Sequence, residues 1–362
     1  MAHTREFAKK RAGDPANRPN MEAKTMTVSS QPRILVVPQP GLYHTLFTPD
    51  ADRALRKLGH VVFNEQAHNP SSPELAGLIP DFDIVLTGWG TPTFTPQVLD
   101  AANRLKLVAH TAGSIKKMLP RPVFERGIAV THAAGAIAPA VADMSLMLIM
   151  LMLRHAYRHD QAVRAGEWRS QSIPALGQEI VHQRIGVVGA GYTGRCLIKL
   201  LRALGVETWV YDPYLSNKRA AELGVHQVEL DDLLANCRVV SMQVPSTPAT
   251  YHMIGARELG LMQDGAALVN TARAHSIDQE ALLAELESGR IQAALDVFDQ
   301  EPLPPDHPYR ALPNVFLTPH IAGASEKARQ RQGDYTVQEI ERFVNGQPLQ
   351  WPVTIDMLDT MA

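Results

Sequence analysis

Cysteine is nearly absent from this sequence of 362 residues, which contains only Cys196 and Cys237. Two cysteines cannot supply a disulfide framework or a cysteine-rich metal site, and we interpret both as small buried residues in a reducing, cytoplasmic compartment. The formal net charge of −2 shows no excess of basic residues. Nucleic acid and anionic membranes are therefore not implied as partners.

Long hydrophobic runs are also missing. The longest, residues 144–153, is bracketed by Asp143 and Arg154 and is too short to span a bilayer, so we interpret it as a core helix. The first thirty residues lack the apolar stretch of a signal peptide. We expect them to be a disordered extension or a mis-assigned start. The length and the 45% hydrophobic content allow a soluble chain of two domains, each with its own core.

The most informative stretch is 184–212, which we interpret as strand, glycine turn, helix and strand, with a carboxylate at its end. Gly189, Gly191 and Gly194 have the G-x-G-x-x-G spacing. In that motif the glycines permit the turn, the approach of a pyrophosphate and close packing of helix on strand. Asp212 could accept a hydrogen bond from a ribose 2′-hydroxyl and would repel a 2′-phosphate. The stretch predicts a dinucleotide site that prefers NAD to NADP, the alternative being a glycine turn that binds nothing.

Strand-like and helix-like segments alternate along the rest of the chain, which is typical of parallel α/β sheets. Strands are expected at 34–37, 61–64, 84–87, 107–110, 128–131, 208–211, 239–244, 267–270, 293–297 and 316–318, and helices at 48–58, 95–103, 231–235, 256–261, 278–287 and 325–344. We predict two Rossmann-like domains with doubly wound parallel sheets. Residues 31–137 and 322–362 would form a discontinuous substrate-binding domain, and 138–321 the NAD-binding domain.

Two helices carry further expectations. A long helical stretch from about residue 139 to the region of Gly166 could cross from one domain to the other. Ser276 and Gln279 have the spacing of a capping box for the helix at 278–287. We therefore expect Ser276 to cap that helix.

Polar residues follow three of the later strands, at the edge where open α/β sheets bind ligands. They are Arg273, Glu301 and His320. An arginine can hold a substrate carboxylate bidentately and polarise a carbonyl group. A histidine can exchange the hydroxyl proton, and a neighbouring carboxylate favours the protonated ring and fixes its tautomer. Beside a nicotinamide these groups would move hydride on a 2-hydroxy acid, the alternative being a structural ion network.

Taken together, these motifs resemble those of the D-isomer-specific 2-hydroxyacid dehydrogenase family, whose members include phosphoglycerate, glycerate and D-lactate dehydrogenases. The resemblance covers roughly residues 33–345. It implies that Arg273 binds the substrate, that Glu301 pairs with the histidine and that His320 is the acid/base. It also implies reversible NADH-dependent reduction of a 2-oxo acid to the (R)-2-hydroxy acid by a homodimer that associates through the NAD-binding domain.

The resemblance further implies the ligand contacts. Cofactor contacts map onto Gly189, Gly191, Tyr192, Thr193, Gly194, Asp212, Val244, Pro245, Thr271, Arg273, Asp296 and His320. The family's glycine-rich loop, whose backbone N–H groups bind the substrate carboxylate, maps onto Ala112, Gly113 and Ser114, with Arg273 as a further substrate contact. No metal is implied. His155 and His159 have zinc-ligand spacing but no third ligand nearby, so we expect them on a solvated helix face.

The sequence departs from the family pattern at three places. Ala274 replaces the usual glycine after the catalytic arginine, which would strain the loop if this position needs a positive φ. The family's glycine-rich loop is normally followed by Asp-Asn or Asp-His, whereas here the acidic residue is missing and Lys116 and Lys117 stand near the expected site. We hypothesise that they favour a substrate with a second negative charge, the alternative being two solvated lysines. Asp143 replaces the usual glutamate of V-A-E.

Some residues and functions stay open. Trp89, His44 and His110 lie in strand-end loops and either line the pocket or serve in packing. The Met-rich face of 144–152 is core or subunit interface. A formate dehydrogenase would need glutamine at Glu301, and a phosphoglycerate dehydrogenase with regulatory modules would need more than the roughly forty residues after His320. An NAD-dependent corepressor scaffold keeps the same triad, and would differ in having no turnover.

Overall fold

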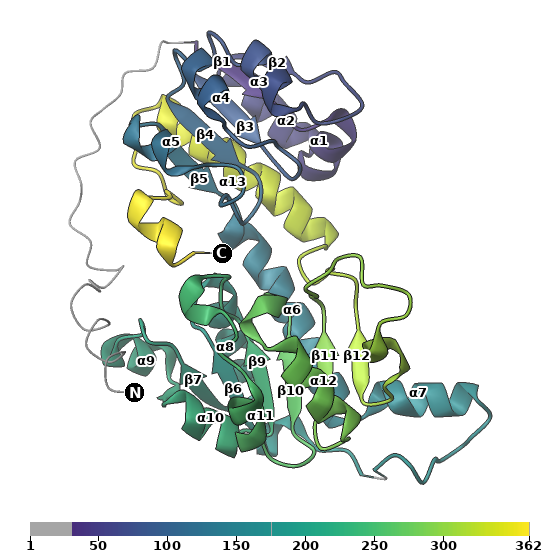
Figure 1. Cartoon of the computed structure of the whole chain (residues 1–362). Helices are drawn as coiled ribbons and strands as arrows, with labels where there is room; N and C mark the ends of the chain where they lie inside the picture. Colours follow the sequence, from purple (N-terminus) through teal and green to yellow (C-terminus); the bar gives the residue numbers. More distant parts are fainter. Residues whose placement is uncertain (1–30, 175, 362) are drawn as a thin grey trace.

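Two parallel β-sheets organise the chain in this computed structural model, which describes residues 31–174 and 176–361 (Figure 1). The predicted N-terminal extension, residues 1–30, lies outside the described residues. One sheet and its helices form the upper half of the view, and the second sheet forms the lower half. The prediction of two doubly wound Rossmann-like sheets is confirmed. The predicted domain boundaries remain predictions.

The first sheet has five strands in the order β2-β1-β3-β4-β5, all parallel. Its strands are β1 (Arg33–Val36), β2 (His60–Phe63), β3 (Ile84–Thr87), β4 (Leu107–His110) and β5 (Ala129–His132). The helices between them are α1 (Pro40–Leu46), α2 (Pro49–Lys57), α3 (Ser72–Leu78), α4 (Pro96–Ala101) and α5 (Arg121–Glu125). The central strands β3 and β4 are buried along their whole length, as expected for a sheet covered on both faces.

The second sheet has seven parallel strands in the order β12-β11-β10-β9-β6-β7-β8. They are β6 (Arg184–Val188), β7 (Glu207–Tyr211), β8 (His226–Gln227), β9 (Val239–Met242), β10 (Ala267–Asn270), β11 (Gln292–Leu295) and β12 (Val315–Leu317). Its helices are α8 (Tyr192–Ala203), α9 (Asn217–Leu223), α10 (Leu230–Asn236), α11 (Ala256–Leu261) and α12 (Gln279–Glu287). The chain reverses direction across the sheet between β6 and β9, and such switch points are where dinucleotides bind.

Polar caps explain where several helices of the first half begin. Thr48, Ser71 and Thr95 each accept a hydrogen bond from a backbone N–H in the first turn of α2, α3 and α4. A proline occupies one of the first two positions of each helix, where its missing N–H costs nothing. The sequence therefore encodes these helix starts locally.

The prediction of a single long helix after residue 139 is wrong, because this stretch forms two helices. α6 spans Ala134–Leu153, and α7 spans Ala156–Arg164. His155 lies between them with φ +49°, in the left-handed region, so the first helix cannot continue through it. α6 also begins earlier than expected and contains Pro139 within its second turn.

The length and apolar composition of α6 would suffice to cross a membrane, and it is the one helix of the described residues that meets both criteria. Half of its apolar window is buried inside the protein. It packs against α8, against β10 and against α13 (Glu326–Val344). These contacts make α6 a core helix, as predicted.

The predicted capping box of α12 is also wrong. Asp278 is the N-cap, and its carboxylate accepts from the N–H groups of Glu280 and Ala281 at 3.1 Å. Ser276 Oγ instead donates to the carbonyl of Arg273 at 2.9 Å. Ser276 belongs to the short 3-10 helix Ala274–Ser276 that precedes α12, which takes it out of capping range.

The last long helix, α13, returns the chain to the first sheet, where it packs on α1, α2 and β4 (Figure 1). Each sheet contributes two buried apolar clusters, one on each face. Both cysteines are free, Cys237 being buried and Cys196 only partly buried. The expectation of two buried cysteines therefore holds for Cys237 alone.

Candidate active site

The glycine loop follows β6 at the switch point. Gly189 has φ +102°, and a Cβ atom there would lie 2.7 Å from the carbonyl oxygen of Gln243. A Cβ on Gly194 would lie 2.0 Å from the carbonyl of Gly189, whereas a Cβ on Gly191 would meet nothing within 4 Å. The three glycines thus permit the turn, pack helix on strand and leave open space at the start of α8, as a pyrophosphate requires. This loop, with Tyr192 and Thr193 in its first helical turn, fits a dinucleotide.

Asp212 follows β7, where the sequence placed it, and both of its carboxylate oxygens accept backbone hydrogen bonds. Oδ2 accepts from Ala190 N at 2.7 Å, and Oδ1 accepts from Tyr214 N at 2.8 Å. Each carboxylate oxygen has a second lone pair for a ribose hydroxyl. Asp212 therefore braces the glycine loop and can also contact a nucleotide.

A buried polar network near the glycine loop contains the predicted Thr271 and three side chains that we did not predict from the sequence, Gln243, Ser145 and Ser241. Gln243 Nε2 donates to Ser145 Oγ at 3.1 Å, to Ser241 Oγ at 3.0 Å and to Thr271 Oγ1 at 3.2 Å. The hydroxyls of Ser145 and Thr271 are 2.7 Å apart. All four residues are buried. This network joins α6, β9 and the end of β10, and a buried polar side chain without a motif gives no signal in the sequence.

Further predicted cofactor residues lie at the ends of adjacent strands. Val244 and Pro245 directly follow β9, and Val244 packs close to Gly189. Arg195, in the first turn of α8, was not singled out from the sequence, and its guanidinium donates to the carbonyl of Ala190 at 2.7 Å. Burial lowers the pKa of Arg195 from its ordinary value. A largely desolvated cation beside the glycine loop adds to the attraction for phosphate groups.

The predicted catalytic side chains meet at the carboxyl ends of β10, β11 and β12. His320 Nδ1 lies 2.7 Å from Glu301 Oε2, and Phe298 N donates to Glu301 Oε1 at 3.0 Å. Arg273 lies close enough for its charge to act on Glu301. The structure thus brings all three residues to one edge of the seven-stranded sheet.

Electrostatics at the site favour an ionised glutamate. Partial burial raises the pKa of Glu301, but the hydrogen bonds from His320 and Phe298 and the charges of His320 and Arg273 outweigh burial. The net pKa of Glu301 therefore lies below its ordinary value. Burial lowers the pKa of Arg273, and Glu301 opposes this effect. An arginine remains charged throughout the ordinary pH range, so both groups are ionised.

Asp296 fixes the turn that carries His320. Its Oδ1 accepts from Thr318 Oγ1 at 2.6 Å and from Ile321 N at 2.9 Å, and its Oδ2 accepts from Ala322 N at 2.9 Å. His320 itself has φ +54°, an unusual conformation for a residue other than glycine. Such strain at a histidine held by a fully buried carboxylate is a common mark of a functional position.

The replacement of glycine by Ala274 strains nothing. Ala274 begins the 3-10 helix Ala274–Ser276, and it is not among the described residues with positive φ. Among the described residues, the carbonyl of Ala272 is the protein acceptor for the Arg273 guanidinium, at 2.7 Å. Other N–H groups of the guanidinium remain for a ligand.

The predicted carboxylate-binding residues Ala112, Gly113 and Ser114 form the loop after β4. Within the described part of the chain, their backbone N–H groups donate to no protein acceptor. Two carbonyls, one just before the loop and one within it, in contrast accept hydrogen bonds from the protein. Gln332 Nε2 of α13 donates to Thr111 O at 2.6 Å, and His132 Nδ1 lies 3.0 Å from Gly113 O. Consecutive free N–H groups on a fixed loop form an anion-binding concavity.

His110 lies beneath this loop and is a packing residue, which decides one of the open alternatives. It is 4% exposed, and its Nδ1 lies 3.0 Å from Thr87 Oγ1. Burial, together with the nearby His132, lowers the pKa of His110 to about 3, although a hydrogen bond with the backbone of Ser114 opposes the shift. The ring is neutral at ordinary pH and connects β3 to the carboxylate-binding loop.

The two lysines after the loop differ. Lys116 is partly buried, and its Nζ donates to the carbonyl of Ser246, in the loop after β9, at 2.8 Å. Lys117 is exposed. Lys116 therefore links the two halves of the chain. Trp89 lies in the loop after β3, as expected, whereas the expectation for His44 is wrong, because it lies in the last turn of α1 and not in a strand-end loop.

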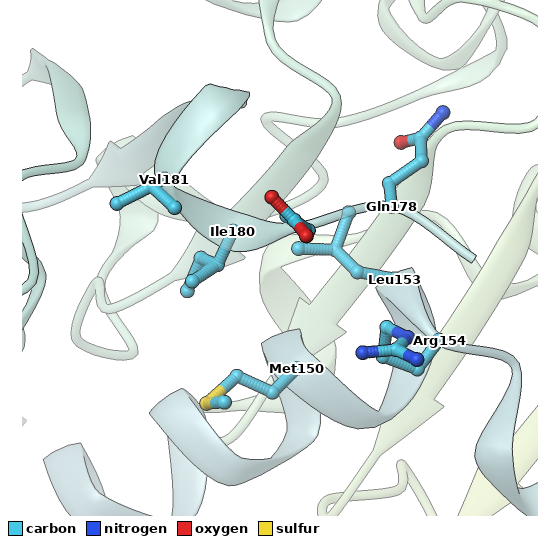
Figure 2. Close-up of a pocket in the computed structure, with 7 residues that line it drawn as sticks. Met150, Leu153, Arg154, Gln178, Ile180 and Val181 are labelled. Atoms are coloured by element: carbon cyan, nitrogen blue, oxygen red, sulfur yellow. The ribbon is translucent and has the colours of Figure 1, made fainter.

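No group of three His, Cys, Asp or Glu side chains is placed to hold a metal ion in residues 31–174 and 176–361. A shallow groove lies elsewhere, between the end of α6 and the segment before β6 (Figure 2). Its lining is mostly apolar, with Met150, Leu153, Ile180 and Val181. The groove contains none of the predicted catalytic residues, so we do not assign the chemistry to it.

Comparisons with known proteins agree with the fold and with the family resemblance. Residues 146–322 match the family model for the D-isomer specific 2-hydroxyacid dehydrogenase, NAD binding domain. A glyoxylate reductase of Korarchaeum cryptofilum is 35% identical over 281 residues, which are 77% of this chain and 84% of that protein. A D-3-phosphoglycerate dehydrogenase of Methanocaldococcus jannaschii is 32% identical over 300 residues, 82% of this chain but 56% of its own. The fold is also that of Rhodotorula graminis D-mandelate dehydrogenase, with TM-score 0.80 at 24% identity over 89% of this chain and 97% of the other.

Two parallel sheets, a dinucleotide loop at the switch point and an Arg-Glu-His cluster define an NAD-dependent oxidoreductase. The chain belongs to the D-isomer-specific 2-hydroxyacid dehydrogenase family, as the resemblance implied. NAD is its cofactor, and its reaction class is that of a D-2-hydroxyacid dehydrogenase.

Proposed function

We propose that this protein interconverts a small 2-oxo acid and the (R)-2-hydroxy acid, with His320 as the acid/base. The observation that carries the proposal is the 2.7 Å contact between His320 Nδ1 and Glu301 Oε2, with Arg273 at the same sheet edge. NADH, when bound at the glycine loop, supplies the hydride. The (R) stereochemistry rests on the family.

In reduction, the protonated His320 gives its Nε2 proton to the substrate oxygen. Glu301 accepts a hydrogen bond from the Nδ1–H group throughout the reaction. This bond sets the tautomer of the ring and stabilises the imidazolium. In oxidation the neutral ring takes the hydroxyl proton back at Nε2. Glu301 is therefore a tuning group that acts through His320.

Arg273 and the loop of Ala112, Gly113 and Ser114 would together hold the substrate carboxylate. The loop offers backbone N–H groups, and Arg273 offers a fork that matches a carboxylate and can also polarise the 2-oxo group. The contacts to NAD would come from the glycine loop and from Asp212, Val244, Pro245, Thr271 and Asp296.

The names of the relatives span several 2-oxo acids, including glyoxylate and a phosphorylated acid. The test is oxidation of NADH by the purified protein with a panel from glyoxylate and hydroxypyruvate to aromatic and sugar-derived 2-oxo acids. His320→Ala should lower kcat by about 10² to 10⁴, the usual contribution of a positioned acid/base. Absence of turnover across the panel would favour the rival function, an NAD-dependent scaffold.

We also propose that the protein is a cytoplasmic homodimer. Met147 and Met150 on α6 and Val181 beside them are 46%, 44% and 47% exposed. Met150 and Val181 line the apolar groove of Figure 2. This face belongs to the predicted NAD-binding domain, through which the family resemblance implies dimerisation. A second copy would remove these side chains from water.

A further inference from the structure

Arg329 is a partly buried cation without a counter-charge among the described residues. It lies on the first turns of α13, and its guanidinium carbon is 4.0 Å from the centroid of the Trp89 ring. Neither an ion pair nor a protein acceptor for its guanidinium N–H groups is found within residues 31–174 and 176–361. Burial lowers the pKa of Arg329, and no charged neighbour adds to or opposes that effect. The charge is therefore partly desolvated without a counter-charge.

The contact with Trp89 leaves the hydrogen-bonding edge of Arg329 available. A guanidinium over an aromatic ring contacts it through its face, whereas its five N–H donors lie in its plane. The planar fork matches a carboxylate or a phosphate bidentately. The ring also restricts the motion of the side chain, which lowers the entropy that binding would cost.

Two observations place this pair beside the carboxylate-binding loop. Trp89 directly follows Gly88, and a Cβ on Gly88 would lie 3.0 Å from Thr111 Oγ1, one residue before that loop. Gln332 lies three residues after Arg329 on α13, on the same helix face, and donates to Thr111 O at 2.6 Å. Arg329 and Trp89 therefore lie beside the loop proposed to hold the substrate carboxylate.

We propose that Arg329, positioned by Trp89, binds a second acidic group at the distal end of the substrate. The substrate class is then 2-oxo and 2-hydroxy acids that carry a further carboxylate or phosphate. This inference rests on the proposed function of the site. It assigns the second negative charge to Arg329 instead of Lys116, because a hydrogen bond to Ser246 O holds the ammonium group of Lys116, whereas no protein acceptor among the described residues holds the guanidinium of Arg329.

The test measures binding without turnover. The protein saturated with NADH is titrated by calorimetry with (R)-2-hydroxy acids in matched pairs, which form non-reacting complexes. The pairs are malate with 2-hydroxybutanoate, 2-hydroxyglutarate with 2-hydroxypentanoate, and 3-phosphoglycerate with glycerate. The first two pairs report a distal carboxylate, and the third reports a distal phosphate.

At least one doubly acidic ligand should bind about ten- to a hundredfold more tightly than its partner, the range for hydrogen bonds to a charged group. In Arg329→Gln, the affinities of the two members of that pair should differ by no more than about threefold. The affinity for the singly acidic ligand should stay within about threefold of its value in the original protein. Arg329→Lys, which keeps the charge but not the fork, should retain part of the ratio. Lys327→Gln removes one charge from the same turn of α13 and should retain all of it.

The inference would be overturned by equal affinities within every pair, by a ratio that survives Arg329→Gln, or by an equal loss for both members of a pair. Tighter binding of (R)-mandelate than of every doubly acidic ligand would also overturn it, since the subsite would then serve an apolar group against the 38% exposed Trp89. Unchanged NADH affinity confirms that each variant is folded. Failure of the proposed function would appear separately, as absence of NADH oxidation with all 2-oxo acids.

Discussion

The imidazole of His320 and the carboxylate of Glu301 are joined through Nδ1 and Oε2 at 2.7 Å, although the two residues lie in different loops. Replacing Glu301 by Gln keeps a hydrogen-bonding shape but removes the charge that stabilises the protonated ring. The alkaline limb of the reductive activity profile should therefore move to lower pH, and the limb for oxidation should move in the same direction. The measurement is kcat/KM against pH in both directions.

A deuteride isotope effect on the same variant shows whether hydride transfer limits the rate. If it does and the reductive profile of Glu301→Gln matches the original, the pair does not act as proposed. Asp299→Asn, a change of an acidic residue in the same loop, serves as the matched control.

Arg273→Lys should separate substrate binding from cofactor binding. The lysine keeps the charge but loses the bidentate fork, so KM for the oxo acid should rise about ten- to a hundredfold while KM for NADH stays within about threefold. Arg331→Lys is a control on α13, where Arg331 donates to the carbonyl of Ala136. Equal increases in both KM values for Arg273→Lys would contradict a role in holding the substrate.

Asp212 should set the preference for NADH over NADPH, measured as the ratio of the two kcat/KM values. Asp212→Ala should bring the two kcat/KM values closer together, because it removes the repulsion of the 2′-phosphate. It also removes the acceptor for Ala190 N and Tyr214 N. Asp212→Asn keeps one acceptor oxygen and removes the charge, so it isolates the electrostatic part. Equal use of both cofactors by the unchanged protein would refute the prediction.

His110 should make the protein sensitive to acid. Its folded pKa, about 3, lies below the unfolded value of 6.5, so the unfolded chain binds more protons between these values. Well above pH 6.5 the protonation of His110 does not change the free energy of unfolding. As the pH falls below 6.5 it lowers that free energy increasingly, by about 2 kcal/mol at pH 5. His110→Asn should reduce the loss of unfolding free energy between pH 7.5 and 5 by that amount, as measured by urea denaturation.

His182→Asn is the matched control for this acid effect, because the His182 side chain is 78% exposed. It should leave the pH dependence unchanged. The same dependence in His110→Asn as in the original protein would show that the ring is not held neutral.

The exposed face of α6 should hold two copies together. Charging it with Met147→Lys and Met150→Lys should convert the dimer to monomers in light scattering coupled to size exclusion. Leu78→Lys is a control at a similarly exposed apolar residue on α3, being 41% exposed against 46% and 44%. A monomeric original protein, or a double variant that remains dimeric, would rule out this interface.

The local signals in the sequence predicted much of the fold. Apolar runs with β-branched residues identified most strands to within a residue or two, because a buried parallel strand has no polar face. Short helices such as α1, α3, α5 and α9 were missed, since their amphipathic patterns are too brief to register. The break at His155 was missed because a left-handed residue other than glycine or asparagine has no sequence signature.

The residues of the candidate site also divide into those that the sequence predicted and those that it did not. Arg273, Glu301 and His320 were found because each follows a strand within a recognisable motif. Gln243 and Arg329 were not, since each depends on neighbours brought from distant parts of the chain, such as Ser145 and Trp89. Residues of this kind need the three-dimensional structure.

The two helices that pass between the sheets, α6 and α13, also pack against each other (Figure 1). The two halves would open and close about these helices as a hinge, with Arg273 and His320 on one half and the loop of Ala112 on the other. Closure would then exclude water from the site, and reopening would set the rate at which the product leaves.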